Sequence, residues 1–205
     1  AADQPPSALA PLGATRVPFT KVILTASADG DVTVSSLTLE RQGAADNDAF
    51  DNVSVLDQNG IQIGLTKTLN SSNKAIFTDK IVVKAGTSHT ITLAGKMLDT
   101  TPSSSNAGQV ARLALVAVSA GSSTVNASLP IVGNGMTINE SLTIGAVTMA
   151  RGSFDPGAAQ TKEVGVKNYT FSSIKVTAGS AEKVFLPFIR WNQSGSAGSG
   201  DLGNL

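Results

Sequence analysis

The densest group of chemically active side chains lies in the segment Asp46-Asn47-Asp48-Ala49-Phe50-Asp51-Asn52. Its carboxylate and amide oxygens suit Ca²⁺, which takes roughly six to eight oxygen ligands in flexible loops. Asp46, Asp48 and Asp51 are therefore the candidate ligands of a calcium site. The competing interpretation is a solvated turn, because Asp and Asn side chains readily hydrogen-bond to the backbone next to them. The sequence leaves both interpretations open.

No catalytic residue is predicted elsewhere. The chain has no Cys and one His, His89, which excludes thiol catalysis, Cys-ligated zinc and any multi-histidine metal site. It contains no His-Glu-x-x-His, P-loop, dinucleotide-binding glycine motif or G-x-S-x-G elbow. Glycosidase chemistry would need two carboxylates that converge in space, and the acids here lie mainly in turns. We therefore expect no enzymatic activity, and no cofactor other than calcium.

The charge balance bears on partners and location. Fifteen Lys and Arg against fifteen Asp and Glu give a formal net charge of zero, which argues against nucleic acid as a partner. No apolar run approaches the ~18 residues needed to span a membrane. Low charge with abundant Ser, Thr, Gly and Ala is typical of exported proteins, so we expect an extracellular or cell-surface location. The chain opens Ala1-Ala2-Asp3, without Met or an apolar signal segment, and we expect a processed form or part of a longer chain.

The elements that carry these residues are predicted to be strands. Short segments rich in Val, Ile, Leu and Thr alternate with turns of Gly, Asn, Asp and Ser, which indicates an all-β fold. Asn59-Gly60 predicts a hairpin with a type I′ turn. Helix competes with strand only over 107–120, where β-branched residues favour strand. The predicted strands are 17–27, 31–41, 50–56, 61–65, 75–77, 80–84, 87–97, 109–119, 123–128, 131–137, 142–151, 164–178 and 183–191. Their spacing, without helices between them, predicts an antiparallel β-sandwich.

An internal repeat divides the chain. A shift of 152 residues aligns 1–53 with 153–205 without a gap, with identical residues at nine positions that include Phe19 and Phe171. The apolar pattern also agrees, and a slip of one residue would destroy that agreement. The alternative is two unrelated strand pairs of similar pattern. We predict an extended arm over 1–16, an Ig-like sandwich over 17–138, and a connecting strand with a partial second module over 139–205.

The second copy of the repeat has too few strands for a sandwich of its own. An incomplete sandwich cannot cover its apolar faces and leaves sheet edges open. Three outcomes remain: packing on the first module, completion by another chain through strand addition, or excision from a longer tandem array. The proline-rich arm is either a linker or a strand donated to a neighbour.

The quoted segments resemble a known class of protein. The residues that carry the resemblance are 17–21 (VPFTK), 31–41 (DVTVSSLTLER), 85–87 (AGT) leading into 91–93 (ITL), and 151–157 (RGSFDPG). They resemble tandem Ig-like modules of surface-layer-type proteins from uncultivated bacterial lineages. The resemblance rests on strand and turn patterns over most of the chain and includes no catalytic motif. It implies a structural role at the cell surface, in a layer, filament, stalk or adhesin.

The run Val184-Phe185-Leu186-Pro187-Phe188-Ile189 carries apolar residues on both faces of a predicted strand. Burial on both sides exceeds what the first module would supply, so we expect an interface. Pro187 lacks an N–H and predicts an edge or bulge. The predicted interface residues are Phe185, Leu186, Phe188, Ile189 and Trp191.

The expected function is a non-enzymatic structural subunit of an extracellular assembly, such as a surface layer (S-layer) or filament. Its copies, or neighbouring surface proteins, would join through strand edges and apolar contacts. The alternative is a secreted adhesin or carbohydrate-binding module with Trp191 and Tyr169 as a sugar-stacking platform.

Overall fold

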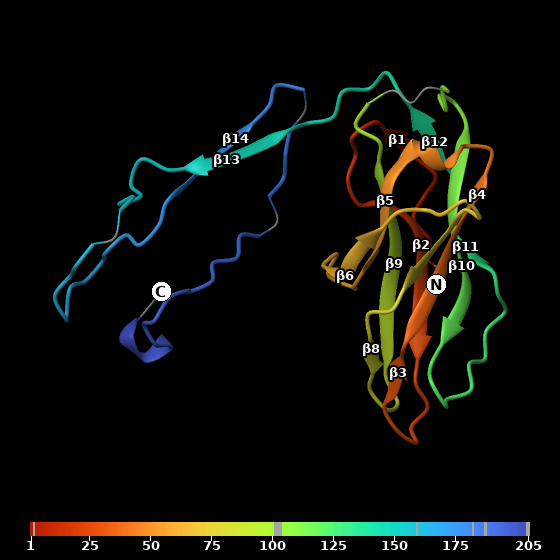
Figure 1. The fold of residues 1–205 in the computed structure, drawn as a ribbon, viewed down its shortest axis with the longest axis horizontal. Helices are drawn as coiled ribbons and strands as arrows, with labels where there is room; N and C mark the ends of the chain where they lie inside the picture. Colours follow the sequence, from red (N-terminus) through yellow and green to blue (C-terminus); the bar gives the residue numbers. More distant parts are fainter. Residues whose placement is uncertain (2, 101–103, 159, 182, 187, 204–205) are drawn as a thin grey trace. The chain divides into compact units, whose positions relative to one another are not determined.

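The computed structural model describes residues 1, 3–100, 104–158, 160–181, 183–186 and 188–203, and these are all-β apart from two short 3₁₀ turns (Figure 1). The chain divides into unit 1, Ala1–Ile144, and unit 2, Gly145–Leu205. The strands of unit 1 are β1 (Leu9–Pro11), β2 (Val17–Thr25), β3 (Val32–Val34), β4 (Ser36–Gly43), β5 (Phe50–Leu56), β6 (Gln62–Lys67), β7 (Lys74–Phe77), β8 (Ile81–Val83), β9 (Ser88–Met97), β10 (Val110–Ser119), β11 (Ile131–Val132) and β12 (Met136–Asn139). The strands of unit 2 are β13 (Val147–Arg151) and β14 (Ile174–Ala178); the 3₁₀ turns are η1 (Asn47–Ala49) and η2 (Ser199–Asp201).

Unit 1 is a β-sandwich, as predicted. One sheet has the order β1-β12-β10-β4-β7, with β11 also paired to β10, and the other has the order β2-β9-β5-β6. A separate ribbon joins β3 to β8. Every pairing is antiparallel except that of β1 with β12.

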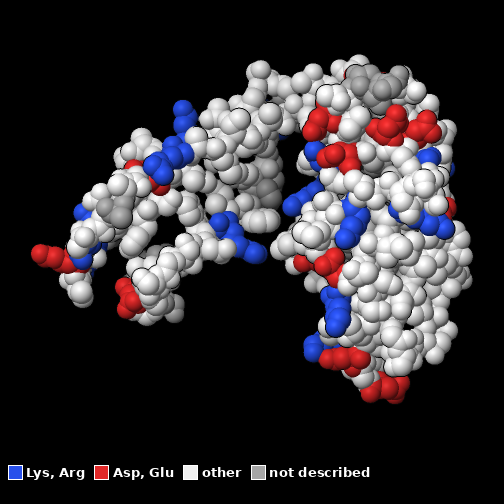
Figure 2. Space-filling model, in the orientation of Figure 1, with Lys and Arg blue, Asp and Glu red and all other residues white. Residues whose placement is uncertain are grey.

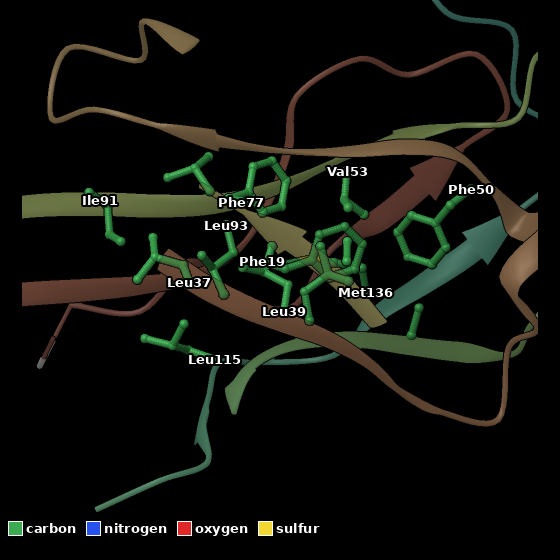
Figure 3. Close-up of a cluster of buried hydrophobic side chains, with 14 of the residues drawn as sticks. Phe19, Leu37, Leu39, Phe50, Val53, Phe77, Ile91, Leu93, Leu115 and Met136 are labelled. Carbon is green, nitrogen blue, oxygen red and sulfur yellow. The ribbon is translucent and has the colours of Figure 1, made fainter. Parts of the chain in front are cut away.

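The core of unit 1 follows from the period-two alternation of apolar and polar residues along its strands. In β9, Ile91 and Leu93 point inward and are fully buried, while the flanking Thr90 and Thr92 are half-buried. Phe19 from β2 and Phe50 from β5 belong to the same cluster, and the centres of their rings lie 5.5 Å apart (Figure 3). The facing sheet contributes Leu39 and Leu115, which lie opposite each other on β4 and β10.

A buried hydroxyl links the two sheets. Thr20, at an irregularity in β2, donates its hydroxyl proton to the backbone oxygen of Leu113 on β10 and accepts a hydrogen bond from the N–H of Gly133 at 2.9 Å. A side chain at Gly133 would meet the backbone oxygen of Phe19, since a Cβ there would lie 2.1 Å from it. The glycine therefore permits this close approach of the backbone.

The predicted hairpin at Asn59-Gly60 is confirmed, but the prediction of a type I′ turn is wrong. Gly60 has φ +75° and Asn59 has no positive φ, whereas a type I′ turn needs both positive. Asp57 and Ile61 close the strand ends, since the N–H of Asp57 donates to the oxygen of Ile61 at 2.8 Å. The carboxylate of Asp57 accepts from the N–H groups of Asn59 and Ile61, which stabilises this longer loop.

The N-terminal arm is extended, but it is part of unit 1 and not a separate linker. β1 pairs in parallel with β12, and Ala10 is fully buried in the core. Gln4 hydrogen-bonds the backbone of Lys21 on β2, and Asn134 donates to the oxygen of Pro5 at 2.8 Å. The compact unit also extends to Ile144, past the predicted boundary at 138.

The described residues of unit 2 contain one two-stranded ribbon. β13 and β14 pair antiparallel, with Met149 opposite Val176. The strand predicted over 183–191 is absent from the described part of that segment, and so is the strand predicted over 123–128 in unit 1. A strand forms where a neighbour pairs with its backbone, and neither segment has such a neighbour among the described residues.

Candidate interaction surface

The β13–β14 ribbon has one face that is apolar except for Arg151 at its end, called the apolar face below, and one mainly polar face. Side chains that lie opposite each other across an antiparallel pair share a face. The apolar face has Val147 opposite Ala178, Met149 opposite Val176 and Arg151 opposite Ile174. The other face carries Thr148, Ala150, Lys175 and Thr177. Met149 and Val176 are exposed, so the apolar face lacks a cover in the described residues of unit 2.

The hydrogen bonds at the ribbon's ends show which edge of β14 is in use. The N–H of Gly152 donates to the oxygen of Ser173 at 2.7 Å, and the N–H of Gly179 donates to the oxygen of Ala146 at 2.7 Å. Backbone groups of alternate residues point to opposite edges of a strand. Ser173 and Gly179 point toward β13, so the residues of the opposite parity, 174, 176 and 178, direct their N–H and C=O groups to the other edge. No described strand pairs with that edge.

The hydrogen bonds of the equivalent strand in unit 1 show which of its edges is paired. At an offset of 152 residues, β14 corresponds to 22–26, most of which lies in β2. There the N–H of Ala26 donates to the oxygen of Thr87 at 3.0 Å, so residues 22, 24 and 26 point toward β9. The edge of β14 that is open in unit 2 is therefore the edge that β9 occupies in unit 1.

The opposite edge is closed in both units by the residues that precede the strand. In unit 1, Gln4 accepts from the N–H of Lys21 at 2.9 Å and donates to its oxygen at 2.7 Å. In unit 2, the N–H of Ser173, the equivalent of Lys21, donates to the Asp155 carboxylate at 3.1 Å. This bond, with one from Gly157, lowers the pKa of Asp155. The shared closure supports the repeat.

Equivalent positions differ sharply in burial. Unit 1 has a buried core, while no described residue of unit 2 is buried. The buried residues of unit 1, each given with its exposed equivalent, are Phe19 (0%) with Phe171 (58%), Val34 (4%) with Leu186 (38%), Leu37 (2%) with Ile189 (49%) and Leu39 (0%) with Trp191 (58%). In unit 1 these side chains are covered by two sheets, and the described part of unit 2 has one ribbon.

All five predicted interface residues are exposed. Phe185 is the most open, at 86%, and Phe188 is also exposed. They lie in a segment without strand structure, so the predicted division of 183–191 into two strand faces does not apply. The prediction for Pro187 falls outside the described residues. We call the apolar ribbon face and these five residues the unit-2 apolar surface.

Tyr169 and Trp191, the aromatic residues considered for sugar stacking, have different contacts. Tyr169 packs edge-on against Phe171 at 5.1 Å, and the Lys162 ammonium lies 4.9 Å from the centre of the tyrosine ring. Within the described part of the chain, Trp191 has no ring contact of this kind. Phe171 was missed as a site residue, although its alignment with Phe19 was visible in the repeat.

The three candidate calcium ligands have different partners. Asn106, which is buried, accepts from the N–H of Asp46 at 2.8 Å and donates to the carboxylate of Asp48 at 2.9 Å. Asp51 lies on β5 and its carboxylate contacts the Lys96 ammonium at 2.8 Å. Among the residues that the structure describes, no group of three or more His, Cys, Asp or Glu is placed to hold a metal ion. Calcium at this loop stays a prediction, and Asn106 was not foreseen.

Lys96 contacts two acids and lines a depression at the sheet of β2, β9, β5 and β6. Asp99 contacts its ammonium at 3.0 Å in addition to Asp51. The hydrogen bond that Lys96 donates to Asp51, followed by the one that it donates to Asp99, raises the pKa of Lys96. The amine therefore stays charged at neutral pH and is a poor nucleophile. The depression is lined by Thr15, Arg16, Asn52, Ser54, Gln62, Thr66 and Lys96.

His89, the single histidine, lies on β9 opposite Leu24. Its Nε2 is buried and has no hydrogen-bond partner among the residues that the structure describes. A general base needs hydrogen-bond reach to a nucleophile. The structure gives this nitrogen none among the residues described.

Scans against protein-family models, curated proteins and solved structures found no match. In the described part of the chain, no helix has the length and apolar character needed to cross a bilayer. Acidic and basic side chains are interspersed and separated by uncharged surface on the face shown in Figure 2.

Proposed function

We propose that this chain is a non-enzymatic structural subunit of an extracellular assembly, a surface layer or a filament, whose copies join through the unit-2 apolar surface. The observation that carries the proposal is the contrast in burial between equivalent residues of the two units. Side chains that form the core of unit 1 have exposed equivalents in unit 2, and the strand edge that β9 covers has an open equivalent in β14.

Physical chemistry favours association at such a surface. Apolar side chains that are exposed to water are stabilised when another surface covers them. An isolated two-stranded ribbon is also marginally stable in water, and additional strands over an apolar face stabilise it. A net charge of zero adds no long-range repulsion between copies. The low charge and the abundance of Ser, Thr, Gly and Ala support the proposed extracellular location.

The alternative function is a secreted adhesin or carbohydrate-binding module. Exposed aromatic rings at Phe171 and Trp191 favour it, because aromatic faces stack on apolar sugar faces. This alternative requires a monomer whose melting temperature rises on addition of a glycan.

The test is the mass of the full chain in solution, measured by light scattering over a range of concentrations. We expect oligomers or polymers that dissociate on dilution, and Phe185→Ser should weaken them. Leu65→Ser is the matched control, since Leu65 is an exposed apolar residue of β6 in unit 1.

A monomer at every concentration would contradict the assembly role, as would equal weakening by both variants. Repeating the measurement with a chelator tests calcium separately. Loss of the assembly with chelator would support a calcium site at Asp46, Asp48 and Asp51.

A further inference from the structure

The open edge of β14 carries backbone groups of three successive alternate residues, Ile174, Val176 and Ala178. Their side chains lie on the apolar face of the ribbon, as shown by their pairing with Arg151, Met149 and Val147. An added strand would therefore satisfy these backbone groups and extend the apolar face in one step. Unit 1 shows the same edge and face in use, where β9 pairs with β2 beside the buried Val22.

We propose that this edge pairs with the same edge of a second copy of the chain. The two β14 strands lie antiparallel about a twofold axis, with Val176 opposite the partner copy's Val176. This inference rests on the proposed function and names its contact. The result is a four-stranded sheet in the order β13, β14, partner β14, partner β13, which is an isologous interface.

The register follows from hydrogen-bond parity. Residues that point to the open edge pair only with residues of the partner that also point to it, so 174, 176 and 178 pair among themselves. Centring the pair on Val176 is the register that uses all five residues of β14 in both copies. It places Ile174 opposite Ala178, a large side chain against a small one.

Charge also suits a second copy. On the other face, this register places Lys175 opposite the uncharged Thr177, so no like charges lie directly opposite each other. The net charge of zero removes overall repulsion.

The pairing doubles the apolar face of the ribbon. Each copy contributes Val147, Met149, Ile174 and Val176 to one continuous face. The repeat indicates what covers it: residues 184–191 correspond to 32–39, which in unit 1 belong to β3 and β4, and β4 lies in the sheet that faces β2. The exposed Leu186, Ile189 and Trp191 are the equivalents of residues that cover the core there.

Single cysteines test the register, since the native chain has none. In the full chain under mild oxidation, Val176→Cys places two thiols in a hydrogen-bonded pair with Cα atoms about 5.5 Å apart, within disulfide range. Thr177→Cys is the matched control. In this register residue 177 and its counterpart in the partner are diagonal neighbours whose Cα atoms lie about 7–8 Å apart, where a disulfide is unfavourable. Met149→Cys reports pairing through β13 instead. We expect at least about tenfold faster dimer formation for Val176→Cys than for Thr177→Cys or Met149→Cys.

Charge at position 177 gives a second readout that needs no disulfide. Thr177→Glu faces Lys175 of the partner and should tighten the dimer, while Thr177→Lys should weaken it. Each change involves two symmetric pairs and amounts to about 2- to 30-fold in the dissociation constant.

The outcomes separate this proposal from the assembly role. Assembly with equal cross-linking at positions 176 and 177, or with dominant cross-linking at 149, overturns β14 pairing and leaves the assembly role standing. A chain that stays monomeric overturns both. Equal affinity for the Glu and Lys variants at position 177 overturns the register.

Discussion

Leu39 and Trp191 occupy equivalent positions of the repeat, but their truncation to alanine should have different effects. Leu39→Ala should lower the stability of unit 1, and Trp191→Ala should weaken self-association. Leu39 is fully buried on β4, with Leu115 of β10 and Ala75 of β7 opposite it in the flanking strands. β4 is hydrogen-bonded to both of these strands, so the sheet resists collapse into the space that Leu39→Ala would leave. The substitution should cost about 2–5 kcal/mol of unfolding free energy.

For a sandwich of this size, that loss corresponds to a fall in melting temperature of about 4–20 °C. Trp191 is exposed, so Trp191→Ala should change the unit-1 melting temperature by less than about 2 °C. It should instead weaken self-association, which Leu39→Ala should leave intact well below its melting temperature.

Scanning calorimetry on dilute protein is the appropriate assay. The one Trp and the one Tyr both lie in unit 2, so their fluorescence does not report unfolding of unit 1 directly. Light scattering at higher concentration gives the association constant of each variant. Equal falls in melting temperature for the two variants would refute the inference that equivalent positions have different roles. So would unchanged association for Trp191→Ala.

Two further predictions concern polar contacts of unit 1. Asn106→Ala should lower the unfolding free energy by about 1–3 kcal/mol, because it leaves the N–H of Asp46 without its acceptor and the Asp48 carboxylate without its donor. Urea titrations followed by circular dichroism measure this loss. An unchanged urea midpoint would show that water replaces the amide. The hydrogen bond from Lys84 lowers the pKa of Asp31 below 3.8, so its stabilising effect is complete above that pH and is lost as the pH falls through the lower folded-state value. Asp31→Asn should therefore lower the melting temperature at pH 6 and narrow its difference from the native chain as the pH falls below 3.8; a constant difference across this range would contradict the linkage.

The local part of the fold could be predicted from the sequence. Alternation of Ile91 and Leu93 with threonines located β9 to within one residue. The preference for strand over helix at 107–120 was correct, because β-branched residues favour the pleated backbone that β10 adopts. Asn59-Gly60 located the β5–β6 hairpin, while its turn type depends on the carboxylate of Asp57, which the dipeptide rule does not consider.

The long-range contacts of the fold could not be predicted from the sequence. β1 contains Pro11 and is short, and it is a strand because β12, far along the chain, lies beside it. Asn106 meets Asp46 and Asp48 across sixty and fifty-eight residues. Asp51 is a close neighbour of these acids in sequence, but it contacts Lys96 on the adjacent β9. Local composition places these acids together, while tertiary pairing decides their partners.

The lack of buried side chains in the described residues of unit 2 also has a thermal consequence. The heat capacity of a protein rises with the apolar surface that water reaches. Unit 2 already holds that surface in water before any heating, so melting it alone adds little to the heat capacity. In the proposed assembly, the large change in heat capacity accompanies association of the copies, so the association enthalpy should become more negative as the temperature rises. We therefore expect the proposed association to be driven mainly by the release of water near room temperature and to weaken on cooling.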